Sequence, residues 1–163
     1  LNREGFESGQ FYSREFFPGY IYLAEGFLLP YILNHFLKGY QVARKYLQMN
    51  NQELADFLDA GGALVDVRRE EEWQQTGIVA DSILLTFFAA DGSSQPGEWV
   101  AQLNQQVGTE QPVALICRTG YRTGLICDFL VEVSDREKIY NLTDGIFGWL
   151  AEQFPVVTAD IAS

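Results

Sequence analysis

The sequence predicts an α/β protein of three layers: a small, mostly parallel sheet with helices on both faces, preceded by an aromatic N-terminal extension. From about residue 50 to residue 157, short apolar segments alternate with helical ones. Strands that are apolar throughout are buried on both faces, which indicates a parallel sheet covered by helices. A chain of 163 residues is also long enough to bury the core of one ordinary domain.

The N-terminal extension, residues 1–45, is rich in aromatic residues that follow no regular period. Apolar residues then recur at helical spacing and predict a helix over residues 30–48, with Pro30 in its first turn. We expect the extension to pack on the body of the same chain, or alternatively on a second copy in a homodimer or on a lipid surface. The domain itself is expected at 46–157, with a tail at 158–163.

The elements of the domain follow in chain order. Asn50, with Glu53 three residues later, resembles a capping box and predicts a helix that ends at Gly61 and Gly62. Pro96 is suited to the first turn of a later helix. Strands are predicted at residues 63–67, 82–87, 112–117 and 138–142, and further helices at residues 68–75, 96–107, 122–133 and 145–154.

The composition narrows the range of functions. The net charge of −11 argues against nucleic acid or an anionic membrane as a partner. Cys117, Cys127 and the single His35 lack metal-ligand spacing, so we expect no metal and no other cofactor. The apolar stretch at 19–37 is interrupted by Glu25 and other breaks, which predicts a soluble protein. The compartment stays open, with the cytoplasm favoured over the periplasm.

One segment concentrates the residues that can carry chemistry. It begins at the end of the third predicted strand, where α/β sheets bind ligands, and reads Cys117, Arg118, Thr119, Gly120, Tyr121 and Arg122. A tight turn through Gly120 can aim successive N–H groups at one centre, and the next helix adds its positive end. Arg118 and Arg122 are fork-shaped donors suited to oxyanions. We expect an anion cradle that favours the nucleophilic thiolate of Cys117.

From about residue 50 to 157 the chain resembles a rhodanese homology domain of the single-domain sulfurtransferase type. Four pieces match that family in order, at residues 52–73, 76–86, 114–123 and 139–156. The third piece, "ALICRTGYRT", resembles the active-site loop C-R-[ST]-G-x-R-[ST]. The second piece departs from the family's G-H-I-P-G-A, with Ile78, Ala80 and Asp81 in place of His, Pro and Gly. Asp144 also replaces the first glycine of a closing pair.

The resemblance implies sulfur transfer without a cofactor. Cys117 would take the outer sulfur of a small anionic donor such as thiosulfate and become a persulfide. The amides from Arg118 to Arg122 would hold that persulfide, and the two arginines would orient the donor. A thiol or cyanide would then accept the sulfur. Tyr121 would line the rim, and Asp66, Arg68 and Glu72 would fix the fold beside the loop.

Two other readings of the loop stay open. Cys-loop phosphatases and arsenate reductases carry five residues between cysteine and arginine, whereas four separate Cys117 from Arg122. The shorter loop favours one sulfur atom over a tetrahedral oxyanion. A module of the same fold that binds sulfur, an anion or a partner without catalysis is the other alternative. Cys127 lies in an apolar helical segment, so we expect a buried and inert thiol.

Overall fold

The computed structural model describes residues 46–160. Within them, five strands form one parallel sheet in the order β1-β5-β4-β2-β3. The strands are Leu47–Met49 (β1), Ala63–Asp66 (β2), Ile83–Leu84 (β3), Val113–Ile116 (β4) and Ile139–Leu142 (β5). The helices are Asn51–Asp59 (α2), Glu70–Thr76 (α3), Pro96–Gln106 (α4), Tyr121–Val133 (α5) and Gly145–Ala151 (α6). The predicted alternation of strands and helices is confirmed.

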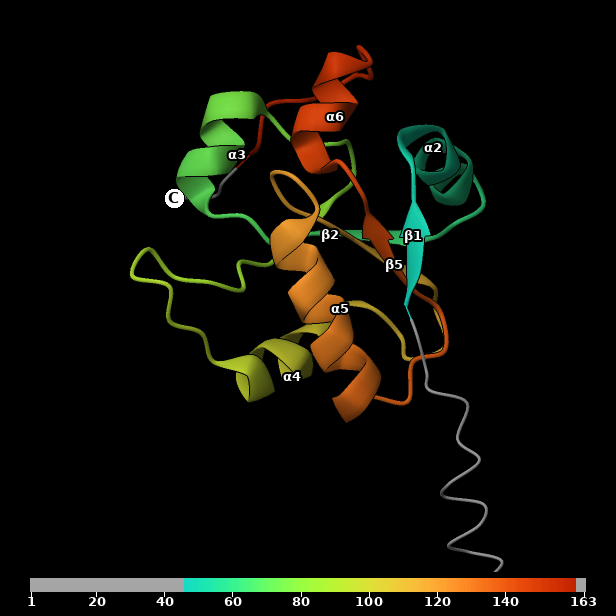
Figure 1. The fold of residues 1–163 in the computed structure, drawn as a ribbon, viewed down its shortest axis with the longest axis vertical. Helices are drawn as coiled ribbons and strands as arrows, with labels where there is room; N and C mark the ends of the chain where they lie inside the picture. The colour runs from blue at the N-terminus through green and yellow to red at the C-terminus, as the bar shows by residue number, and fades with distance from the viewer. Residues whose placement is uncertain (1–45, 161–163) are drawn as a thin grey trace, which may run out of the picture. The chain divides into compact units, whose positions relative to one another are not determined.

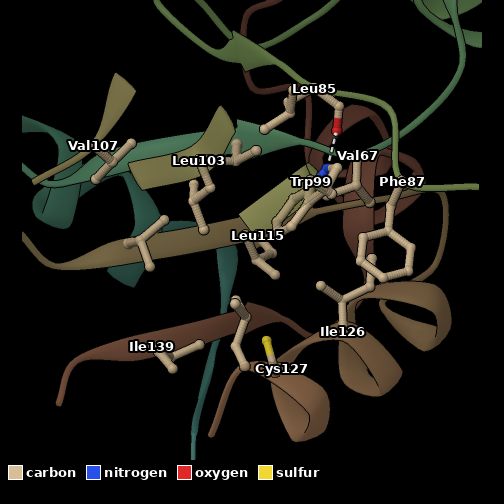
Figure 2. Packing of buried hydrophobic residues seen from close by; sticks show 14 of the residues in the cluster. Val67, Leu85, Phe87, Trp99, Leu103, Val107, Leu115, Ile126, Cys127 and Ile139 are labelled. Atoms are coloured by element: carbon tan, nitrogen blue, oxygen red, sulfur yellow. Dashed lines mark hydrogen bonds between the residues drawn. The ribbon is translucent and has the colours of Figure 1, made fainter. Parts of the chain in front are cut away.

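Two apolar clusters, one on each face of the sheet, produce the three predicted layers. On one face, α4 and α5 pack against the strands through residues such as Trp99 and Ile126 (Figure 2). The Trp99 indole also donates a 2.9 Å hydrogen bond to the carbonyl oxygen of Leu85, so the ring is both buried and anchored. On the opposite face, α2 and α6 contribute Leu54 and Trp149 (Figure 1).

Alternation along β4 decides the side on which the candidate nucleophile lies. Val113 and Leu115 belong to the cluster under α4 and α5, whereas Ala114 and Ile116 belong to the one under α2 and α6. Successive side chains of a strand point to opposite faces. Cys117 continues this alternation at the end of β4 and joins the first cluster, beside α5.

The predicted capping box at the start of α2 is present. The N–H of Glu53 donates to Asn50 Oδ1 at 2.9 Å, and the N–H of Asn50 donates to Glu53 Oε2 at 2.8 Å. Two orphan donors are thereby satisfied, which fixes the start of the helix. Within residues 46–160, no helix combines the length and apolar character needed to cross a bilayer.

The predicted helix over 30–48 is wrong at its end, because Leu47–Met49 form the edge strand β1. This strand pairs with β5, with Leu47 opposite Tyr140 and Met49 opposite Leu142. A partner about ninety residues away overrides the local helical spacing. The rest of that helix, the extension at 1–45 with its homodimer contact, and residues 161–163 lie outside the described residues.

The strand predicted over 82–87 is shorter than expected, since only Ile83–Leu84 form ladder pairs with β2. The chain nevertheless stays beside β2. The N–H of Leu85 donates to Asp66 at 3.0 Å, and the N–H of Phe87 donates to Val67 at 3.2 Å. These bonds hold the segment that follows β3 close to the candidate site.

Candidate active site

The loop from Cys117 to Gly120 lies against the turn between β5 and α6. The N–H groups of Ile146 and Phe147 donate to the carbonyl oxygens of Cys117 and Arg118, at 2.8 and 3.1 Å. Gly120 has φ +80°, and a Cβ there would collide with the carbonyl of Thr143. The geometry therefore requires glycine, both for its positive φ and for the closeness of the two turns.

Because the loop carbonyls turn toward α6, the loop N–H groups are left for another partner. Among residues 46–160, no protein group accepts a hydrogen bond from the backbone N–H groups of residues 118 to 123. The first turn of a helix has no internal acceptor for its N–H groups, and residues 121 to 123 are that turn of α5. Donors without an acceptor among the described residues are therefore present at the positive end of a thirteen-residue helix, as an anion cradle requires.

The thiol of Cys117 lies at the base of this loop and is 1% exposed. Its Sγ lies 3.4 Å from the hydroxyl oxygen of Thr123, which itself donates to the carbonyl of Gly120 at 3.0 Å. Because the Thr123 hydroxyl hydrogen points to the carbonyl of Gly120, the hydroxyl oxygen can accept a hydrogen bond from the Cys117 thiol. After ionisation, the same hydroxyl can turn to donate to the thiolate. Thr123 was not among the site residues expected from the sequence, although this residue closes the quoted loop motif.

Both loop arginines bind one carboxylate from α3. Arg122 donates to the two oxygens of Glu72 at 2.9 and 2.6 Å, and an Arg118 nitrogen lies 3.1 Å from Glu72 Oε1. The backbone N–H of Arg69 donates to the same carboxylate at 3.1 Å. Glu72 is 5% exposed, so Arg122 and Glu72 form a largely desolvated, bidentate ion pair. Such a pair is stronger than an exposed pair with a single contact.

Glu72 and Arg122 hold each other in their charged forms. Burial by itself would raise the pKa of Glu72, but hydrogen bonds from Arg122 and Arg69 and the two arginine charges lower that pKa to about 2. Burial by itself would lower the pKa of Arg122. The Glu72 carboxylate outweighs this effect of burial, so the pKa of Arg122 is raised. Cys117 makes a smaller contribution to the same rise in the pKa of Arg122.

A second buried ion pair, between Arg68 and Asp66, connects β2 to the C-terminal end of α3. Arg68 donates to both oxygens of Asp66, at 2.7 Å for the shortest contact, and both side chains are at most 1% exposed. Its remaining donors reach Thr76 at 2.6 Å and the carbonyl of Gly77 at 2.9 Å. This pair ties β2 to the end of α3 and thereby positions Glu72, which agrees with the scaffold role expected for Asp66 and Arg68.

The mouth of the loop is formed by exposed residues. Arg118 is 49% exposed and lies over the ring of Phe147, at 5.6 Å from its centroid. Tyr121 is 73% exposed and Thr119 is also exposed, so both lie at the rim. Within the described part of the chain, no group of three or more His, Cys, Asp and Glu side chains could hold a metal ion.

Cys127 lies in α5 and differs from Cys117 in its surroundings. It is fully buried, as predicted, and its Sγ lies 3.7 Å from the carbonyl oxygen of Tyr140. Burial, with smaller effects of Asp128 and Cys117, raises the pKa of the Cys127 thiol far above its ordinary value. The environment therefore keeps this thiol protonated.

The model of the rhodanese-like domain family matches residues 50–152. This chain belongs to the rhodanese-like domain family. An uncharacterized protein of Rickettsia prowazekii is 28% identical over 94 residues, which cover 56% of this chain and 74% of the relative. The matched residues extend the likeness from the loop motif to β2, β3, β4 and β5 and to the five described helices, whereas the edge strand β1 precedes them.

Solved structures share the fold of this rhodanese-like domain. A polysulfide-sulfur transferase homodimer from Wolinella succinogenes has a TM-score of 0.55 and 20% identity, over 82% of this chain and 92% of that one. A Rhodopseudomonas palustris protein, described as a possible tyrosine phosphatase, has a TM-score of 0.52 and 13% identity, over 86% of this chain and 99% of that one. At these identities the likeness establishes the fold alone.

The departures in the second piece of the rhodanese pattern lie in the connection between α3 and β3. Asp81, which replaces a glycine, has φ +59°, a conformation that favours glycine and that aspartate tolerates better than most residues. Ile78, which replaces a histidine, is 7% exposed and exchanges backbone hydrogen bonds with Val157. Ile78 therefore helps to close the domain near its C-terminal end.

Proposed function

We propose that this protein is a sulfurtransferase that carries a sulfane sulfur on Cys117. The observation that supports it most strongly is the thiol of Cys117 at the base of a loop whose N–H groups from 118 to 123 have no acceptor among the described residues. A persulfide anion extends one sulfur atom beyond the thiol and can accept several such donors.

In the first step, the Cys117 thiolate attacks the outer sulfur of a donor such as thiosulfate. A sulfur–sulfur bond forms to Cys117, and the bond between the two donor sulfurs breaks. Sulfite leaves with that electron pair, so the total charge is unchanged. Free N–H groups and the positive end of α5 stabilise the charge that develops on the transferred sulfur.

In the second step, a thiol or cyanide attacks the outer sulfur of the persulfide and restores the Cys117 thiolate. When cyanide is the acceptor, it takes up the sulfur and is released as thiocyanate. The two steps share one covalent intermediate and need no electron donor, because the sulfur moves between nucleophiles.

The two arginines have different parts in this proposal. Arg122 is fixed by two short bonds to Glu72 and raises the positive potential beside Cys117. Arg118 makes one contact with Glu72 and is half exposed, so it can turn toward a donor at the mouth. We assign donor orientation to Arg118 and electrostatic support of the thiolate to Arg122.

The loop length bears on the alternatives. Four residues between Cys117 and Arg122 make a smaller ring of donors than the five of Cys-loop phosphatases, which favours a single sulfur atom. The retained cysteine and both arginines weigh against a module without catalysis.

The test is the intact mass of the full chain after treatment with thiosulfate. We expect a gain of one sulfur atom that disappears with cyanide, is absent in Cys117→Ser and persists in Cys127→Ser. No adduct, with turnover of p-nitrophenyl phosphate, would instead assign the protein to the phosphatases. No adduct and no turnover would support the alternative that the protein is a binding module without catalysis.

A further inference from the structure

The side chain of Arg118 has two partners of different kinds at the mouth of the loop. One of its nitrogens lies 3.1 Å from Glu72 Oε1, and its guanidinium carbon lies 5.6 Å from the centroid of the Phe147 ring. A cation over an aromatic face at this distance is attracted by the quadrupole of the ring. The carboxylate offsets the charge of the arginine, whereas the ring carries no net charge and leaves the guanidinium positive for an incoming anion.

The contact with Glu72 is one that an anion can replace. Arg122 donates to both oxygens of Glu72 at 2.9 and 2.6 Å, and the backbone N–H of Arg69 donates to the same carboxylate. Arg118 therefore shares a carboxylate that already has three donors. Its contact is also the more exposed one, since 49% of the Arg118 side chain is open to solvent, against 25% for Arg122. An anion at the mouth can take over this contact while the Phe147 ring stays beside the guanidinium.

Phe147 is placed beside Arg118 by the backbone of both residues. The N–H of Phe147 donates to the carbonyl oxygen of Arg118 at 3.1 Å, and the N–H of Ile146 donates to that of Cys117 at 2.8 Å. Ile146 is fully buried in the cluster under α2 and α6, whereas Phe147 is 48% exposed and belongs to neither apolar cluster. The ring therefore contributes little to the core, and its contact with Arg118 gives it a different use.

We propose that Phe147 is a positioning residue, whose ring holds the Arg118 guanidinium at the mouth in place to bind the oxygen atoms of the anionic donor. This inference rests on the proposed sulfur transfer. An arginine side chain that a ligand must order loses conformational entropy on binding. The ring orders Arg118 in advance and lowers that cost. The effect is confined to the donor step, because the acceptor attacks after the oxyanion of the donor has left.

The first test measures both steps of the transfer in Phe147→Leu, which removes the aromatic face and keeps an apolar side chain. We expect kcat/KM for thiosulfate to fall about two- to fivefold, as the loss of an exposed cation–π contact predicts. The kcat/KM for cyanide should stay unchanged, and so should the melting temperature. Phe147→Tyr should keep the wild-type values, since tyrosine offers the same ring face. The matched control is Phe57→Leu on α2, where the ring contacts Tyr140, and it should keep kcat/KM for thiosulfate.

A double-mutant cycle separates positioning from support of the fold. In Arg118→Ala, the further change Phe147→Leu should not lower kcat/KM for thiosulfate again, and additive effects of the two changes overturn the inference. An unchanged kcat/KM for thiosulfate in Phe147→Leu alone also overturns it. An equal fall in kcat/KM for thiosulfate and for cyanide, with a lower melting temperature, would assign the ring to the fold and overturn it as well.

The second test measures donor binding without turnover, in full-length Cys117→Ser. Titration with thiosulfate, followed by the NMR signal of the Arg118 Nε–Hε group, gives a Kd that Phe147→Leu should raise about two- to fivefold. Such a rise in Kd, in a protein whose wild type transfers no sulfur, would reject the proposed function and keep Phe147 as the positioning residue of an anion site. Sulfur transfer by the wild type, with the same Kd in Phe147→Leu, would reject the role of Phe147 alone.

Discussion

Cys117 and Cys127 are the same side chain, ten residues apart, in the same apolar cluster. Their exposures of 1% and 0% are nearly equal. Cys117 nevertheless ends a strand and is followed by free N–H groups and Arg122, whereas Cys127 lies inside α5, next to the carbonyl of Tyr140. The comparison predicts that burial alone does not decide the reactivity of a thiol, and that the direction of the surrounding dipoles does.

The largest effect expected from this comparison is in reactivity toward an anionic alkylating agent. Iodoacetate should modify Cys117 in the native protein about a hundredfold faster than Cys127, because the N–H groups and the arginine that follow Cys117 attract the carboxylate of the reagent, whereas the burial of Cys127 keeps its thiol protonated. Peptide mapping after timed alkylation measures both rates. In denaturant the two rates should become equal, and equal rates in the native protein would remove the distinction.

The next largest effect is a difference in stability between substitutions of Gly120, which precedes α5, and of Gly124, which lies inside it. Gly120→Ala should destabilise the protein by about 2–4 kcal/mol, because the new Cβ adds a positive-φ penalty to a collision with Thr143. Gly124→Ala is the control in α5. Its Cβ would lie 3.5 Å from the Tyr46 hydroxyl, an ordinary contact, so alanine should stabilise by about 0.5–1 kcal/mol. Urea denaturation of both variants measures these changes.

The carboxylate that holds the arginines near Cys117 gives a pH test. The pKa of Glu72 falls from an unfolded value near 4.3 to about 2, so its contribution is present above pH 4.3 and is lost as the pH falls toward 2. The contribution is on the order of 3 kcal/mol at neutral pH.

Glu72→Gln should remove that part of the pH dependence of unfolding, measured between pH 5 and pH 2, and lower stability at neutral pH. The neighbour Glu71 is exposed and lies 3.5 Å from Arg69. Glu71→Gln should therefore change stability by less than about 0.5 kcal/mol and keep the acid slope. Equal slopes in both variants would contradict the assigned role of Glu72.

The smallest effect lies away from both cysteines. Asp81 and Gln153 have φ near +60°, and glycine should relieve the strain at each. We expect Asp81→Gly and Gln153→Gly each to raise the melting temperature slightly, by the equivalent of about 0.5–1 kcal/mol. A loss of stability in both would show that the left-handed conformation is not strained there. Reactivity at Cys117 should be unaffected.

Much of the fold could be predicted because its signals are local. Asn50 with Glu53 marks the start of α2, and apolar segments mark β2, β4 and β5. The edge strand Leu47–Met49 could not be predicted, since three residues carry no recognisable period and their pairing with β5 comes from distant residues. For the same reason the segment at 82–87 was predicted as a longer strand than its ladder supports.

Local sequence specifies the loop, which consists of a cysteine at the end of a strand, a glycine able to adopt φ +80°, and a helix that begins at once. These features depend on neighbours in the chain and on backbone geometry. The partner of the two arginines becomes known only from the folded chain, because Glu72 lies fifty residues before Arg122 and no local pattern relates the two.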